Sequence, residues 1–256
     1  MLKIKSLNLR NKQISTFDND NPVTNTLSMG KYWDEENYVI FSKYRRQHTD
    51  FIDAGAYIGT ASLLMYDILK DNNENQLIHA FEPINHYCTE KNIIDNNVSS
   101  FIKLYKVGLG SENCSLNRWS NEPIGLPGSS IVHLNGLPNN LEKKKITDLI
   151  VENGEIDIRT LDSYNFANIG FIKLDCEGME LDILNGSKET IINNNFPPLF
   201  IEIWGQDGWR NDVEYYKQDY KNDIFNFLLT LGYYKGVQIN KDDFIFLTEY
   251  DYNRTL

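Results

Sequence analysis

Two carboxylates close a short apolar run past the middle of the chain, and they are the side chains best placed to do chemistry. The segment 171–186 reads FIKLDCEGMELDILNG. Its apolar start predicts a buried strand that ends at Asp175 and Glu177, and an amphipathic helical pattern begins at Met179. Ligands of open α/β sheets bind at the carboxyl ends of the strands. We therefore expect both carboxylates to lie beside the ligand.

A second acidic pattern surrounds a glycine-containing turn. In FIDAGAYIGTAS a predicted strand stops at Asp53, and Gly55 and Gly59 follow, which would let backbone approach a ligand closely. The spacing lacks the middle glycine of the G-x-G-x-x-G pyrophosphate motif. Glu82 ends the next predicted strand, where a carboxylate can accept both hydroxyls of a ribose. The pattern favours S-adenosylmethionine; the alternative is a tight turn with a solvated acid.

Alternating strands and helices must position these groups. Apolar runs indicate strands, and helical stripes or polar helical segments lie between most of them. Such alternation predicts an α/β fold with a mostly parallel sheet and helices on both faces. The predicted strands lie near residues 51–53, 77–81, 101–107, 171–174 and 199–204, with an antiparallel edge hairpin at 233–239 and 243–247.

The domain organisation predicted from these patterns is simple. Residues 1–48 are expected to form an N-terminal arm and helix, with the polar first 30 residues attached loosely and the helix at 31–47. Residues 49–256 would form the main domain. An insert at about 110–158 interrupts it after the third strand, so we expect the insert to lie over the carboxyl end of the sheet.

Composition excludes several classes of protein. With 25 basic against 36 acidic residues the 256-residue chain carries a formal charge of −11, which argues against binding a nucleic-acid backbone. We find no apolar run near the ~20 residues of a membrane span, and no apolar core of a signal peptide at the start. Three widely spaced cysteines indicate neither a disulfide framework nor a CxxC metal site. We expect a cytoplasmic protein with no membrane span and no nucleic-acid partner.

The ordered motifs carry a family resemblance. FIDAGAYIGTAS, HAFEP, VGLGS, RTLDS, FIKLDCEGMELDILNGS and PPLFIEIW occur in this order between about residues 50 and 205. Together they resemble the FkbM-type S-adenosylmethionine-dependent methyltransferases. The resemblance implies the class I, Rossmann-like methyltransferase fold, with a seven-stranded sheet.

The same resemblance implies cofactor contacts. Either Glu35 or Glu36 could match an acidic position that the family often shows. Tyr57 stands where the family often has Asn, and Cys176 where an aliphatic residue is common. The expected cofactor-binding residues are Asp53, Gly55, Ala56, Tyr57, Gly59, Glu82, Pro83, Gly108, Leu109 and Asp175.

Methyl transfer to a hydroxyl needs help in removing its proton. A general base typically contributes ~10²–10⁴-fold, and a divalent metal can instead lower the pKa of the hydroxyl. Asp175 is the first choice for the reacting centre. Glu177 could join it, also as a ligand of Mg²⁺, although capping or a hinge at the helix start is an equal alternative. His133 in the insert is the best histidine candidate for a base.

Other polar residues near these motifs are not expected to take part in the chemistry, apart from a candidate substrate-binding group. Glu180 is expected on a solvated helix face, and Lys173 is expected to reach solvent or pair with a neighbouring acid. A sugar could stack on the aromatic and Arg side chains that follow the fifth strand, and the alternative is that these side chains have structural roles. Glu202, which ends that strand, could face the same crevice or instead pair with a nearby Arg. The candidate substrate residues are Glu202, Trp204, Trp209 and Arg210.

The functional prediction is an O-methyltransferase. Amino-methyltransferases acting on bases commonly carry Asp/Asn-Pro-Pro-aromatic after the fourth strand, where this chain has Asp-Cys-Glu-Gly. With the acidic charge, this makes nucleic acid a poor substrate. The resemblance favours a hydroxyl of a sugar or glycan as the acceptor. The alternatives are another hydroxylated small metabolite, such as a polyketide or phenolic, and a non-catalytic methyltransferase-like partner subunit.

Overall fold

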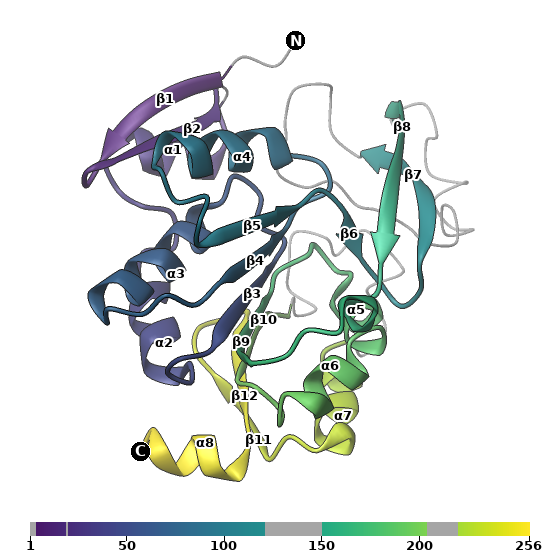
Figure 1. Ribbon diagram of the computed structural model, residues 1–256. Coiled ribbons are helices and arrows are strands. Elements are labelled where there is room, and N and C mark those ends of the chain that lie inside the picture. The colour runs from purple at the N-terminus through teal and green to yellow at the C-terminus, as the bar shows by residue number, and fades with distance from the viewer. Residues whose placement is uncertain (1–3, 19, 121–149, 204–219) are drawn as a thin grey trace.

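A mostly parallel seven-stranded sheet forms the centre of the computed structural model, which describes residues 4–18, 20–120, 150–203 and 220–256 (Figure 1). The five strands from β10 to β5 run parallel, and the last hairpin pairs antiparallel at one edge. This confirms the predicted fold class and edge hairpin. From edge to edge the strands are β11 (Lys235–Gln238), β12 (Asp243–Leu247), β10 (Leu199–Glu202), β9 (Ile169–Leu174), β3 (Asp50–Ala54), β4 (Ile78–Phe81) and β5 (Ile102–Tyr105).

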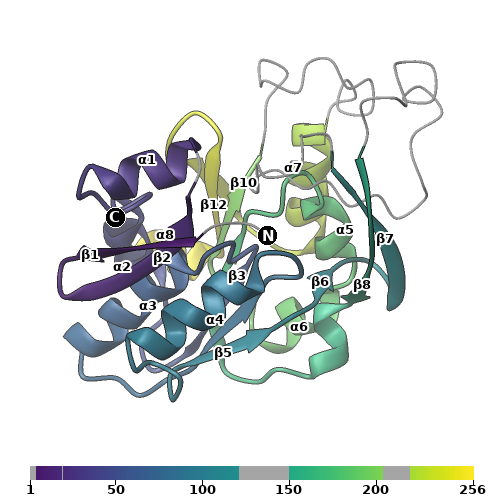
Figure 2. The ribbon, with the colours of Figure 1, turned by 90° about the horizontal axis from the view of Figure 1, so that it is seen from above.

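Helices cover both faces of the sheet, as Figure 2 shows from above. One face packs against α2 (Asn37–Tyr44), α3 (Thr60–Asp71) and α4 (His86–Asp95), and the other against α5 (Glu180–Asn185), α6 (Lys188–Asn193) and α7 (Tyr220–Leu231). Every residue of β9 is buried, because a parallel strand between two helical layers has no solvated face. In the described ranges, no helix is both long and apolar enough to cross a bilayer.

The helix predicted after β9 is two short helices, α5 and α6. They separate at Gly186, where an added Cβ would lie 2.1 Å from the carbonyl oxygen of Gly110. Such close packing leaves room only for glycine at the junction.

The N-terminal segment is not a loosely attached arm, so that prediction is wrong. Residues Ile4–Leu9 (β1) and Lys12–Phe17 (β2) form an antiparallel hairpin, and α1 (Pro22–Ser28) follows. The hairpin is joined to α4 through Asn92, whose side chain accepts from Ser15 N at 2.6 Å and donates to Ser15 O at 3.0 Å. Polar composition concealed this packing because the Ser, Thr and Asn side chains find partners within the fold.

The predicted insert contributes a small second sheet. Its strands are β6 (Gly108–Leu109), β7 (Cys114–Ser120) and β8 (Ile150–Arg159), with β8 parallel to β6 and antiparallel to β7. The small sheet continues from the β5 side of the central one (Figure 1). His133, the predicted histidine base, lies outside the described residues.

Candidate active site

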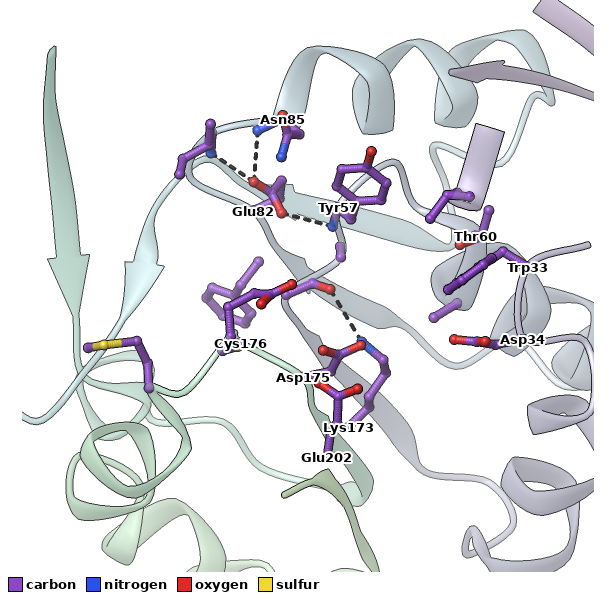
Figure 3. A pocket seen from close by; sticks show the side chains of 18 of the residues that line it. Trp33, Asp34, Tyr57, Thr60, Glu82, Asn85, Lys173, Asp175, Cys176 and Glu202 are labelled. Atoms are coloured by element: carbon purple, nitrogen blue, oxygen red, sulfur yellow. Dashed lines mark hydrogen bonds and ion pairs between the residues drawn. The ribbon is translucent and has the colours of Figure 1, made fainter. Parts of the chain in front are cut away.

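A cavity of about 820 Å³ opens at the carboxyl ends of β3, β4, β9 and β10 (Figure 3). Its volume falls in the range of sites for small molecules, ~300–1,000 Å³. Of the predicted residues, Gly55, Glu82, Asp175 and Glu202 all line it. The tertiary structure thus brings the separate sequence motifs to one place.

Glu82 occupies one end of the cavity with its carboxylate held by backbone. Its Oε1 accepts from the amides of Ile84 at 2.8 Å and Asn85 at 2.7 Å, and its Oε2 accepts from Tyr57 N at 2.8 Å. Burial raises the pKa of Glu82, against the opposing effect of these amides. Three donors fix the orientation of the group and use three of its roughly four lone-pair sites, which leaves Oε2 as the oxygen open to ligand hydroxyls.

The turn after β3 allows backbone to approach the strand beside it. Gly55 has φ 78°, and an added Cβ would lie 1.8 Å from the carbonyl oxygen of Asp175. Thr60 and Ala61, at the start of α3, also line the cavity. The amino end of a helix carries partial positive charge, which suits the carboxylate of an amino-acid ligand.

Tyr57 ties this turn to the N-terminal hairpin. It adopts a left-handed conformation with φ 53°, and its ring packs 5.9 Å from that of Phe17. Thr89 Oγ1 donates to the Tyr57 carbonyl at 2.5 Å. The residue that departs from the family pattern therefore anchors the loop in place, while its side chain still borders the cavity.

A buried lysine links the two acidic motifs. Lys173 Nζ lies 3.4 Å from Asp53 Oδ1 and 3.3 Å from Asp175 Oδ2, and donates to the carbonyl of Gly55 at 3.3 Å. Burial by itself lowers the pKa of Lys173, but the two carboxylates outweigh it and raise the pKa above its ordinary value. Of the two alternatives for Lys173, pairing with acids is correct.

Asp53 lies behind the turn and not on the cavity wall. Its side chain is fully buried, and its Oδ2 accepts from Ser62 Oγ at 2.5 Å. Its Oδ1 faces Lys173 and takes no hydrogen bond from described residues. Asp53 is therefore linked to the cavity through Lys173 and the turn, and the cofactor contact predicted for it stays a prediction.

The turn after β9 is shaped by Glu180, which the sequence placed wrongly on a solvated helix face. Glu180 is buried, and its Oε1 accepts from Cys176 N at 2.9 Å and Gly178 N at 3.1 Å. Its Oε2 accepts from Tyr220 Oη at 2.9 Å, and burial raises its pKa. Glu177 has φ 59° and lines the cavity. Glu180 thus holds the turn that precedes α5, whose N-cap residue Met179 makes no side-chain capping bond.

The wall opposite Asp175 comes from the segment before α2, where the family resemblance pointed to Glu35 or Glu36. Trp33 and Asp34 project into the cavity from the loop before α2, across from Asp175 (Figure 3). Glu35 pairs with Arg10 at 2.6 Å, and neither Glu35 nor Glu36 lines the cavity. Three consecutive acids gave no sequence signal for choosing among them. Asn240 and Asp242 from the β11–β12 loop and Asp243 at the start of β12 complete this wall.

An apolar wall lies at the same end of the cavity as Glu82. Pro83, Gly108 and Leu109 line it together with Ile158 of β8. Gly108 of β6 and Ile158 of β8 are paired neighbours in the second sheet, and an added Cβ on Gly108 would lie 2.6 Å from Ile158 Cδ1, so the second sheet itself forms part of this wall. A flat base suits such a surface, beside the carboxylate of Glu82.

A model of the FkbM methyltransferase domain matches residues 53–234. The chain belongs to the FkbM methyltransferase family. Methyltransferase 1 of Beauveria bassiana (strain ARSEF 2860) is 28% identical over 148 residues, which cover 53% of this chain and only 57% of that relative. The FkbM structure from Methylobacillus flagellatus KT gives a TM-score of 0.49 at 21% identity, covering 77% of this chain and 43% of the other. SAH-bound PaMTH1 from Podospora anserina gives 0.45 at 12% identity, covering 83% and 76%.

The remaining predicted residues of this FkbM family member have mixed outcomes. Glu202 lies beside Asp175 on the cavity wall (Figure 3). Among the described residues, no group of three His, Cys, Asp or Glu side chains is arranged to hold a metal ion, so the Mg²⁺ prediction at Asp175 and Glu177 gains no support. Three predicted substrate residues lie outside the described residues: Trp204, Trp209 and Arg210.

Proposed function

We propose that this protein is an S-adenosylmethionine-dependent O-methyltransferase that acts on a hydroxyl of a sugar or glycan. The observation that carries the proposal is a single cavity with a backbone-anchored Glu82 at one end and Asp34, Asp175 and Glu202 at the other. The Gly55–Thr60 turn lies between them. Family membership supports the methyltransferase part of the proposal.

The residues at the first end fit the parts of S-adenosylmethionine. Glu82 would accept the ribose hydroxyls, and the apolar wall at Pro83 and Leu109 would take the adenine. The amino end of α3 at Thr60 would face the carboxylate of the amino-acid part. When bound, this cofactor supplies a methyl group activated by a sulfonium.

The second end suits an acceptor with several hydroxyls. Asp175 is held in place by Lys173 and would accept a hydrogen bond from the reacting hydroxyl. Trp33 offers a flat face, and Asn240 offers both a donor and an acceptor. Holding the reacting oxygen in line with the methyl group could supply roughly 7–11 kcal/mol in favourable cases.

A second acceptor class has its own support. Met179, Ile183 and Phe200 give the cavity an apolar strip, which would favour a polyketide or phenolic. The cytoplasmic location and the Mg²⁺ requirement remain predictions from the sequence.

Titration calorimetry with S-adenosylmethionine, followed by transfer of a deuterated methyl group, tests this function. The transfer assay would use two panels, methyl glycosides and phenols, with products read by mass spectrometry. Methylation confined to glycosides supports the proposal, whereas methylation confined to phenols selects the second class. Absence of cofactor binding would refute both, and cofactor binding without methylation of either panel would favour a non-catalytic subunit. If EDTA leaves the rate of methyl transfer unchanged, the predicted Mg²⁺ requirement is refuted.

A further inference from the structure

Two carboxylates face each other across the acceptor end of the cavity, and only one of them is held by a cation. Asp175 Oδ2 lies 3.3 Å from Lys173 Nζ. The carboxylate of Asp34 forms no hydrogen bond or ion pair with any residue of the described ranges. The Asp175 carboxylate therefore already has a cationic partner, whereas the Asp34 carboxylate is open to a ligand hydroxyl.

The backbone presents Asp34 to the cavity in a fixed manner. Asp34 has φ 53°, a left-handed conformation that is uncommon outside glycine, and its carbonyl accepts from Asn37 N at 3.0 Å. Tyr32 before it and Asn37 after it are both buried. The loop is thus anchored on both sides of Asp34.

The charged groups around Asp34 come from three other positions on the sheet and from its own loop. Lys173 faces it from β9, Asp175 from the position just after β9, Asp243 from β12, and Glu36 from its own segment. Burial first, and then the charge of Asp175, raise the pKa of Asp34 to about 7, while Lys173 opposes this rise. Efficient bases have a pKa near the working pH.

Asp243 is the other acid of this wall with a raised pKa, at about 6, mainly through burial. Unlike Asp34, it accepts a hydrogen bond from Asn240 Nδ2 at 2.6 Å. That bond stabilises its ionised form and occupies part of its acceptor capacity. Asp34 is the better placed of the two to receive a proton.

We propose that Asp34 is the general base that accepts the proton of the acceptor hydroxyl, while Asp175, bound to Lys173, orients that hydroxyl. This inference rests on the proposed function. The acceptor oxygen gives its proton to the Asp34 carboxylate and forms a bond to the methyl carbon. The bond between that carbon and the sulfonium sulfur breaks, and its electron pair stays on sulfur. The protonated Asp34 then returns its proton to water.

The test compares Asp34→Asn with Glu36→Gln, which removes a neighbouring negative charge outside the cavity. Calorimetry with S-adenosylhomocysteine measures cofactor-site integrity in each protein. The pH dependence of kcat is then measured on the best glycoside of the panel. Carbon-13 NMR of the carboxyl groups follows the titration of Asp34 directly, with its signal assigned by its loss in Asp34→Asn.

The proposal expects Asp34 to titrate near pH 7. It expects Asp34→Asn to lower kcat by at least ~100-fold and to abolish the rise of the rate toward pH 7. Cofactor affinity should stay within threefold in both variants, with normal kcat in Glu36→Gln. If Asp34 titrates near its ordinary pKa of ~4, the proposal is overturned, and this measurement needs no acceptor substrate. A weakened affinity for S-adenosylhomocysteine with kcat retained would also overturn it, because Asp34 would then be a cofactor ligand. Failure of the proposed function itself shows differently, as a wild-type protein that does not bind S-adenosylhomocysteine.

Discussion

Removing the buried ammonium of Lys173 should destabilise the protein strongly. The Lys173→Met substitution would leave Asp53, which is fully buried, facing no cation. At 3.4 Å and an effective dielectric constant of ~20, the Lys173–Asp53 attraction is about 5 kcal/mol. Breaking such a buried pair from one side typically costs ~3–5 kcal/mol of unfolding free energy. Asp175 is partly exposed, so water would compensate most of its loss.

A double-mutant cycle separates the charge effect from lost packing. Asp53→Asn combined with Lys173→Met leaves no uncompensated charge at the buried position, so the pair should recover at least about half of the single-mutant loss. Urea denaturation followed by circular dichroism measures each free energy of unfolding. Lys91→Met is the matched control, because the Lys91 side chain is 42% exposed and pairs with Asp95 at 2.7 Å, an interaction typically contributing under ~1 kcal/mol.

Two results would refute this reasoning about Lys173. One is a loss of less than ~1 kcal/mol in Lys173→Met, which would mean that water or movement compensates Asp53. The other is a double variant no more stable than the single one. The loss should not vary between pH 5 and 9, because the raised pKa keeps Lys173 charged until the pH exceeds its usual titration range.

Three further predictions concern the cavity. Gly55→Ala should cost at least ~3 kcal/mol and abolish cofactor binding, because its Cβ would overlap the carbonyl of Asp175; urea denaturation and calorimetry measure both effects. Glu82→Gln should weaken S-adenosylhomocysteine binding by ~10–100-fold in calorimetry, because bonds to a charged acceptor contribute ~1.5–3 kcal/mol. Asp34→Asn should raise the Tm relative to wild type more at pH 8 than at pH 5. The raised pKa means that the native state binds this proton more tightly than the unfolded chain, so the contribution of Asp34 to stability falls as pH rises from about 4 toward 7.

Each of these predictions has a contrasting outcome. Gly30 is also left-handed, at φ 79°, but an added Cβ there meets nothing within 4 Å, so Gly30→Ala should cost only ~1 kcal/mol. Equal losses in the two glycine variants would contradict the overlap argument. An unchanged affinity of Glu82→Gln for S-adenosylhomocysteine would show that Glu82 does not bind the cofactor. A Tm difference for Asp34→Asn that does not depend on pH would mean that Asp34 titrates normally.

The strands of the central sheet were predictable because each is an apolar run whose burial does not depend on distant detail. Phe171–Leu174 must be covered on both faces wherever it lies, and the acid that ends it must emerge at the carboxyl edge. The same logic located Glu82 and Asp175. Local pattern is sufficient where the hydrophobic effect alone selects the position.

Polar residues were misplaced because their environment is set by partners far away in the chain. Glu180 looks solvated by helical periodicity, yet Tyr220 and two amides satisfy it in the interior. The polar N-terminal segment looks loose, yet Asn92 of α4 completes its hydrogen bonds. A buried polar group is stable only when paired, and pairing over such separations leaves no periodic trace in the sequence.

The sequence by itself determined the order of the strands along the chain, the glycine turn at Gly55 and the acids at the strand ends. Those features follow from backbone geometry and from apolar burial, both of which are written locally. Only the tertiary structure decided that Lys173 joins Asp53 to Asp175, and that Asp34 faces the same cavity from the N-terminal segment. Electrostatic roles depend on distances across the fold, so they appear only once the sheet has assembled.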